Sequence, residues 1–95
     1  MVFDPIEHMF YYLILGTRGG PTRLTILDAL HNPQNTNQLA TLLKLDYKTV
    51  IHHLDLLRKN HLIHSQEHKK YGERFELSNG VSELIKKVRK DSGKG

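Results

Sequence analysis

NQLATLLKLDYKTVIHHLDLLRKNHLI, residues 37–63, contains two helical patterns separated by a very short turn. Apolar residues recur at helical spacing in its first part, which predicts a short helix over 37–43 capped by Thr36. Asp46 has the position of an N-cap for a second helix, from 47 to about 60. Because so few residues separate the two patterns, this stretch predicts a helix-turn-helix unit.

The second of these helices has a buried side and an outward side, because successive residues advance by about 100° around a helix. Val50, Leu54 and Leu57 define the buried side, and His53 is expected at its rim as a half-buried packing residue. His52 points the opposite way. Residues in the first turns of such a helix are those that reach base edges in DNA. The residues expected to contact DNA from this helix are Tyr47, Lys48, Thr49, Ile51, His52 and Lys59.

Two further helices are predicted before this unit. Asp4-Pro5 begins a helix over 5–15 that is apolar nearly all round. The glycine-rich break GTRGGP, residues 16–21, lacks the Walker lysine and a preceding strand, so it is interpreted as a flexible joint. A helix from about Pro21 to His31 follows. Its inward residues are expected to be Leu24, Leu27 and Leu30, with Ile26 at the edge of that face.

Beyond Leu62 the apolar pattern changes to a period of two, which is typical of strands. LIHSQE and ERFELS, residues 62–67 and 73–78, therefore predict a β-hairpin. Positive and aromatic side chains at its tip would meet phosphates or an adjacent minor groove, where they position a protein without reading sequence. These residues are Lys69, Lys70 and Tyr71, with Arg74 just beyond the tip. Asn79-Gly80 begins a last helix over 81–90, and residues 91–95 are expected to form a disordered tail.

This order of elements predicts a mostly α fold with a small β-hairpin, the winged helix-turn-helix, with extra N-terminal and C-terminal helices. A chain of 95 residues has no room for a second core, so residues 1–90 are expected to form a single domain. Within it, 36–60 is the helix-turn-helix and 62–78 the wing. The alternative is an α+β domain of the same layout that binds no nucleic acid.

Charge and composition narrow the function further. The net charge is +4, and residues 44–95 hold 12 of the 14 lysines and arginines, which makes a polyanion the first partner to consider. The chain has no cysteine, so it has no disulfide, thiolate metal site or cysteine nucleophile. Its longest apolar run, 9–15, is too short to span a bilayer. A soluble, cytoplasmic protein that does not contact membranes is expected.

No enzyme, metal or cofactor site is expected. The sequence shows no pair of catalytic acids and no nucleophile elbow, and Ser65 and His64 face opposite ways as neighbours on a strand. His61, His64 and His68 lie across a helix end and a strand, where their spacings do not converge on one metal ion. The sequence indicates no effector.

The stretch from Pro21 to Gly80 resembles the ArsR-like winged-helix transcription regulators, particularly the short archaeal members. The matching pieces are TRLTILDAL, NQLATLLKLDYKTVIHHLDLLRKNHLI and YGERFELSNG. The resemblance implies a homodimeric DNA-binding repressor or activator whose recognition helix enters the major groove. Lys44 and His61 stand where the family usually has glycine, at two places that favour positive φ. The family's metal sensors use cysteines or carboxylate–histidine sets near the dimer helices, and metal sensing is not carried over to this chain.

The first and last helices are predicted to form a dimer interface, because a chain this small is expected to leave part of their apolar surface uncovered. The residues concerned are Ile6, Met9, Phe10, Leu13, Ile14, Val81, Leu84, Ile85 and Val88. The function expected from the sequence is a sequence-specific double-stranded DNA-binding transcription regulator that acts as a homodimer. The alternative is a winged-helix module that contacts another protein instead of DNA.

Overall fold

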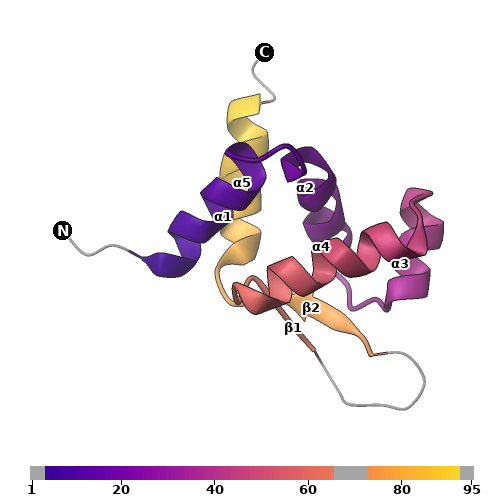
Figure 1. The fold of residues 1–95 in the computed structure, drawn as a ribbon. Coiled ribbons are helices and arrows are strands. Elements are labelled where there is room, and N and C mark those ends of the chain that lie inside the picture. The colour runs from indigo at the N-terminus through magenta and orange to yellow at the C-terminus, as the bar shows by residue number, and fades with distance from the viewer. Residues whose placement is uncertain (1–3, 66–72, 93–95) are drawn as a thin grey trace.

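The computed structural model describes residues 4–65 and 73–92. In these ranges the chain forms five helices and a two-stranded antiparallel sheet (Figure 1). The elements are α1 (Pro5–Leu15), α2 (Gly20–Ala29), α3 (Thr36–Leu43), α4 (Tyr47–Lys59), β1 (Ile63–Ser65), β2 (Phe75–Leu77) and α5 (Val81–Ser92). The predicted order of helices and hairpin is confirmed. α5 continues to Ser92, two residues beyond the predicted end, and the rest of the predicted tail lies outside the described residues.

Side-chain caps set the starts of three helices. The Asp4 carboxylate accepts a hydrogen bond from the Ile6 amide at 3.0 Å, with Pro5 in the first turn, as the sequence predicted for α1. The cap of α3 was misassigned by one residue, because Asn35 takes the role expected of Thr36. Its side chain accepts from the Gln38 amide, and the Gln38 side chain accepts from the Asn35 amide, each at 2.8 Å. This reciprocal pair is a capping box, which Asn35 can form as well as a serine or threonine can.

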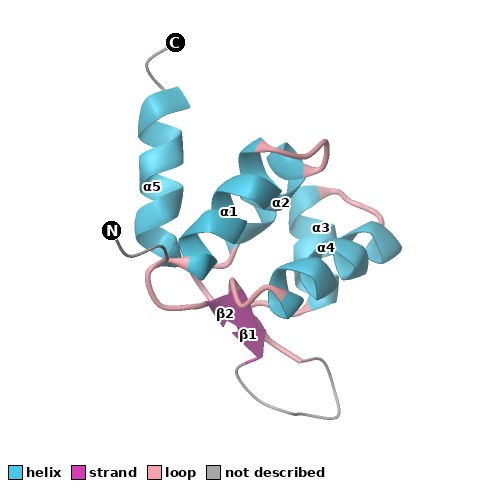
Figure 2. Ribbon diagram, turned by 60° about the vertical axis from the view of Figure 1, so that its left-hand side comes forward, coloured by secondary structure: helices cyan, strands magenta, loops and turns pink. Residues whose placement is uncertain are grey.

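The hairpin is tied to the helices by a short third segment. β1 and β2 pair antiparallel with Ile63 opposite Leu77 and Ser65 opposite Phe75. Gln34, in the loop between α2 and α3, exchanges two backbone hydrogen bonds with Phe75, at 2.8 and 3.2 Å. The base of the wing is therefore held directly to the segment that leads into the helix-turn-helix, below the helices in Figure 2.

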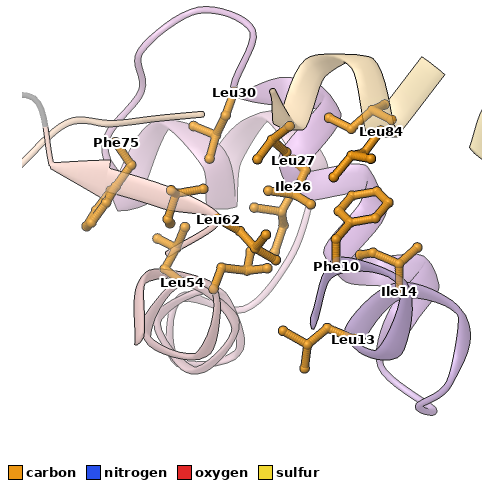
Figure 3. Packing of buried hydrophobic residues seen from close by; sticks show 14 of the residues in the cluster. Phe10, Leu13, Ile14, Ile26, Leu27, Leu30, Leu54, Leu62, Phe75 and Leu84 are labelled. Atoms are coloured by element: carbon orange, nitrogen blue, oxygen red, sulfur yellow. The ribbon is translucent and has the colours of Figure 1, made fainter. Parts of the chain in front are cut away.

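One hydrophobic core joins all the elements (Figure 3). α1 packs against α2 and α5, while α3 and β1 pack against α4. The apolar side chains that close this core are fully or almost fully buried: Phe10, Leu13, Ile14, Ile26, Leu27, Leu30, Leu39, Val50, Leu54, Leu57, Leu62, Ile63, Phe75, Val81, Leu84, Ile85 and Val88. One side of α4 packs against this core, and its other side faces solvent.

The buried face of α2 differs from the prediction. Ile26 is completely buried, whereas Leu24 is only partly buried. Arg23, Ile26, Leu27 and Leu30 share the inward face at helical spacing. The predicted inward face of α2 is therefore rotated about the helix axis from the observed one, because a charged side chain was not expected on the inward face.

The glycine-rich break between α1 and α2 serves close packing more than the flexible joint that was predicted. A Cβ atom added at Gly20 would lie 1.8 Å from the carbonyl oxygen of Ile14. No side chain fits there without separating the two backbones. Gly20 thus allows the start of α2 to cross the end of α1 directly.

Candidate nucleic-acid interface

The turn between α3 and α4 is built around a left-handed residue. Lys44 has φ 56° and ψ 45°, a conformation that glycine adopts more easily. The next residue, Leu45, donates its amide to the Ala40 carbonyl at 3.0 Å, which closes the end of α3. His61 is also left-handed, with φ 64°. The sequence expectation that both positions take positive φ is confirmed, and the short turn sets α4 across α3.

The start of α4 is fixed by Asp46. One carboxylate oxygen accepts from the amides of Lys48 and Thr49 at 3.1 and 3.3 Å. These bonds satisfy two donors that the first turn of a helix leaves without partners. The exposed residues of this turn therefore stand on a well-anchored helix end.

The predicted phase of α4 is confirmed. Val50, Leu54 and Leu57 are buried, while His52 is exposed on the opposite side. The predicted DNA-contacting residues of α4 all retain exposed surface: Tyr47, Lys48, His52 and Lys59 are exposed, and Thr49 and Ile51 are partly exposed. We call these six residues the outward face of α4.

A carboxylate also lies on this side of the helix. Asp55 is exposed, and its Oδ1 atom lies 3.3 Å from an Nη2 atom of Arg58, which is exposed as well. The pair is a solvent-exposed i,i+3 contact, so it contributes little to stability. It balances the Asp55 charge locally, and no ion pair among the described residues includes Lys48 or Lys59.

α3 adds a polar surface that the sequence analysis missed. Asn37, Gln38 and Thr41 are exposed and line a shallow groove with Leu42, which keeps 57% of its surface exposed. The periodicity of the sequence could have predicted their exposure, since they occupy the polar side of a helix whose apolar side is Leu39, Ala40 and Leu43. A smaller hollow of about 210 Å³ lies between the start of α3, Tyr47 and Phe75. Ligand pockets are usually larger than roughly 300 Å³, so this hollow does not indicate a small-molecule site.

Only one of the predicted wing residues can be placed. Arg74 is exposed just before β2. Lys69, Lys70 and Tyr71, predicted at the hairpin tip, lie outside the described residues. The described base of the wing therefore adds one cation on the hairpin.

His53 departs from the half-buried rim position that was predicted. It keeps only 8% of its surface exposed, and its Nδ1 atom lies 3.1 Å from Nη1 of the buried Arg23. Burial, the Arg23 charge and the neighbouring His52 together lower the pKa of His53 below its usual value. Burial also lowers the pKa of Arg23, although a guanidinium keeps its charge in proteins. The pair contacts the buried side of α4, opposite the outward face.

The surface available for a dimer is smaller than predicted and differently placed. Seven of the nine predicted interface residues are already buried inside the single chain: Phe10, Leu13, Ile14, Val81, Leu84, Ile85 and Val88. The expected uncovered stripe on α5 is thus core, because α1 and α2 pack over it. Ile6 and Met9 remain partly exposed. On the outer side of α1, Tyr12 and Leu15 are 54% and 65% exposed, whereas the outer side of α5 carries lysines.

The described residues hold no group of three or more histidines, aspartates and glutamates that could bind a metal ion. His64 instead lies 3.5 Å from Glu76 across the hairpin. None of the helices in ranges 4–65 and 73–92 is both long and apolar enough to cross a bilayer.

Comparison with known proteins gives one family and several solved structures. Residues 20–65 match the sequence model of the family described as bacterial regulatory protein, arsR family. The match runs from the start of α2 to the end of β1, and so includes the whole helix-turn-helix. Comparison with curated proteins gave no match.

The similar solved structures have the same fold. Reduced HlyU from Vibrio cholerae is 21% identical, with a TM-score of 0.71 over 88% of this chain and 86% of that chain. A homodimeric winged helix-turn-helix DNA-binding domain from Mycobacterium bovis is 18% identical, with a TM-score of 0.74 over 92% of this chain and 79% of that chain. A MarR variant from E. coli, complexed with operator DNA, is 12% identical, with a TM-score of 0.67 over 90% of this chain and 64% of that chain. The winged helix-turn-helix fold is therefore confirmed, while these bacterial matches give no support to the archaeal part of the resemblance.

Proposed function

We propose that this chain, whose residues 20–65 match the arsR family of bacterial regulatory proteins, is a transcription regulator that binds double-stranded DNA as a homodimer. The observation that carries the proposal is the outward face of α4. It presents Lys48, His52 and Lys59 to solvent from a helix that is firmly packed on its other side. A cytoplasmic location follows from the same proposal.

The outward face has the chemistry needed to read a major groove. Lys48 can donate to the O6 or N7 atoms of guanine in a specific site and to a phosphate oxygen on other sequences, and Ile51 can pack on a thymine methyl group. His52 can donate or accept a hydrogen bond at a base edge. Lys59, at the other end of α4, is better placed for a phosphate, where it would add affinity without specificity. Sequence-specific recognition is thus assigned to the first two turns of α4.

The second point of contact is the wing. Arg74 would reach the DNA backbone from the base of the hairpin, together with Lys69, Lys70 and Tyr71 of the tip. The polar side of α3 lies beside α4, and its Asn37 and Thr41 are exposed. Uncharged side chains of this kind commonly donate to phosphate oxygens.

In the proposed dimer, a second copy of the chain packs against the outer side of α1. Tyr12 and Leu15 are large apolar residues that the single chain leaves more than half exposed. Met9 lies next to Tyr12 around the helix, and Ile6 and Met9 are the two predicted interface residues that keep exposed area. The similar domain from Mycobacterium bovis is described as homodimeric. A two-fold dimer would set two recognition helices roughly 34 Å apart, facing half-sites about one turn of DNA apart.

The competing function is a protein-binding winged-helix module. Asp55 lies beside the outward face, and Leu42 is exposed on α3, which are features that a protein partner could use. Such a module would not need Lys48 or Lys59. The lysines on the outward face favour DNA over this alternative.

A binding assay with matched lysine variants tests the proposal. Fluorescence anisotropy of a labelled duplex of random sequence would be measured with the unmodified chain, with Lys48→Ala and with Lys87→Ala. Lys87 is exposed on α5, away from α4, so the Lys87→Ala substitution removes one positive charge from a different surface. We expect Lys48→Ala to weaken binding by at least about tenfold, the size of a loss near 1.4 kcal/mol, and Lys87→Ala to leave it nearly unchanged. Equal effects of both variants, or no binding by the unmodified chain, would contradict the proposal.

A further inference from the structure

Arg23 and His53 form a buried polar contact behind the outward face of α4. They are the only charged or polar residues in the described part of the chain whose side chains are counted among the buried ones, with 4% and 8% of their surface exposed. Arg23 comes from α2, and His53 from the middle of α4. A buried cation is costly unless its donors are all satisfied, so the partners of Arg23 decide what this contact does.

Two of the guanidinium nitrogens hold the end of α1. Nε donates to the Leu13 carbonyl at 3.0 Å, and Nη2 donates to the Thr17 hydroxyl. The same hydroxyl donates to the Leu13 carbonyl at 3.0 Å. Arg23 is therefore fixed on α1 from one side and offers its remaining nitrogen, Nη1, to α4.

The contact with α4 requires an uncharged histidine. Nη1 lies 3.1 Å from Nδ1 of His53. A guanidinium has donors only, so Nδ1 must accept, and the single ring proton of His53 must be on Nε2. An imidazolium has a proton on both nitrogens and cannot accept. The contact exists in the neutral state of His53 and is lost when the ring gains a proton.

The surroundings offer no compensation for a charged His53. The charged or titratable groups that face the pair are His52, whose ring centroid lies 5.4 Å from that of His53, and Tyr12 of α1, which acts on Arg23. No ion pair found among residues 4–65 and 73–92 includes Arg23 or His53. The backbone of Gly19 closes the site, because a Cβ there would lie 2.7 Å from Nη1 of Arg23 and 3.1 Å from Cε1 of His53. A second positive charge would thus be confined beside the first.

We propose that Arg23 and His53 are positioning residues for the DNA-binding helix, and that their contact makes DNA binding sensitive to acid. Neutral His53 holds α4 against the end of α1 and the start of α2. Protonated His53 is repelled by Arg23, which loosens the support of the helix and turns its outward face away from the geometry that fits the groove. This inference rests on the proposed function, since it concerns the affinity for DNA.

A matched pair of histidine variants separates this effect from the general effect of acid. Acid adds positive charge to a protein and so strengthens its attraction to phosphates, and each variant is therefore compared with the unmodified chain at the same pH. His53→Asn keeps an acceptor near the position of Nδ1 but cannot be protonated. His61→Asn is the control, because His61 is exposed and asparagine tolerates its left-handed backbone.

Dissociation constants for a labelled duplex of random sequence would be measured at constant ionic strength from about pH 8 to about pH 5, the range in which histidines change charge. Near the upper end, we expect the unmodified chain and His53→Asn to bind within a factor of about two to three of each other. Near the lower end, the unmodified chain should bind at least about tenfold more weakly than His53→Asn, and His61→Asn should follow the unmodified chain. A ratio between the unmodified chain and His53→Asn that stays constant with pH would overturn the inference.

A second measurement does not depend on DNA or on the folding of a variant. Nitrogen-15 NMR of the imidazole rings in the unmodified chain should show Nδ1 of His53 without a proton, and a titration midpoint for His53 below about 6.5, the ordinary value for histidine. The amide signals of residues 47–52 should shift with the same midpoint as His53. If they do and no duplex binds at any pH, the proposed function fails while the positioning contact stands. If His53 titrates without any response in α4, the inference fails even when DNA binds.

Discussion

Arg23 and His53, thirty residues apart in the sequence, meet at 3.1 Å between Nη1 and Nδ1 and join α2 to α4. Because Arg23 also donates to the Leu13 carbonyl, one side chain links the end of α1 to the buried side of α4. The adjacent His52 has no part in this link and faces solvent. The two neighbouring histidines therefore have separate roles.

Alanine substitutions should distinguish the two histidines. His53→Ala should lower the free energy of unfolding by roughly 1–3 kcal/mol, because it leaves a buried donor of Arg23 without a partner. His52→Ala should change that free energy by less than about 0.5 kcal/mol, as is usual for an exposed position, while weakening specific DNA binding. Urea unfolding and duplex binding would be measured on both variants. The reverse pattern would show that the assigned phase of α4 is wrong.

The stability of the fold should depend on pH through His53. Its pKa in the folded chain is lowered by burial and by the Arg23 charge, relative to about 6.5 in the unfolded chain. The folded state thus binds fewer protons, so the contribution is fully present above about pH 6.5 and is lost as the pH falls toward the lower folded-state pKa. Urea unfolding of the unmodified chain and of His53→Asn should diverge only on the acid side, by at most about 1.4 kcal/mol per pH unit. Parallel curves over the whole range would argue against a lowered pKa.

The left-handed turn before α4 should be improved by glycine. Lys44 has φ 56°, which costs a residue with a Cβ atom roughly 1–2 kcal/mol. Glycine avoids this cost but loses more chain entropy on folding, so Lys44→Gly should stabilise the fold by a net of about 0.5–1 kcal/mol. Thr41→Gly is the control, since a change to glycine at an exposed position inside α3 should destabilise by about 0.3–0.5 kcal/mol. Destabilisation by both variants would mean that the Lys44 side chain has a stabilising contact outside its backbone conformation.

The outer side of α1 should control assembly. Tyr12→Glu combined with Leu15→Glu should give folded monomers, because both side chains are more than half exposed in the single chain. Leu42→Glu is the control for an equally exposed apolar residue elsewhere, and it should remain dimeric. Sedimentation equilibrium at tens of micromolar would report the mass of each. A monomeric unmodified chain at that concentration would rule out the dimer and the paired half-sites with it.

The sequence was sufficient for the order of the elements and for the phase of α4. Over 47–60, apolar residues recur at spacings of three and four, and Asp46 precedes them. This local pattern predicts a helix and its buried side, and the structure has both. The same reasoning failed for α2, where Arg23 occupies the inward face with Ile26, Leu27 and Leu30. Arg23 was not expected in that set because it is charged, and its partners are carbonyl, hydroxyl and imidazole groups from other segments, which no local pattern shows.

The proposed dimer surface also shows what the sequence cannot predict. The apolar stripe of α5 was recognised, yet its burial depends on how closely α1 and α2 pack over it. Gly20 lets the start of α2 cross the end of α1 closely, because a Cβ there would meet the Ile14 backbone. Periodicity identifies an apolar face without identifying which neighbour covers it. The exposure of Tyr12 and Leu15 could be recognised only from the structure, which shows which side of α1 the core buries.

The salt dependence of duplex binding tests the central claim most directly. If Lys48, Lys59, Arg74 and the wing lysines Lys69 and Lys70 meet phosphates, the logarithm of the binding constant should fall with the logarithm of salt concentration by roughly 0.9 for each contact, or about four to five per protomer. Lys48→Ala should reduce that slope by about one, and Lys87→Ala should leave it unchanged. A slope near zero between low and moderate salt, or one that is identical in the Lys48→Ala variant, would contradict the proposal that the outward face of α4 binds DNA.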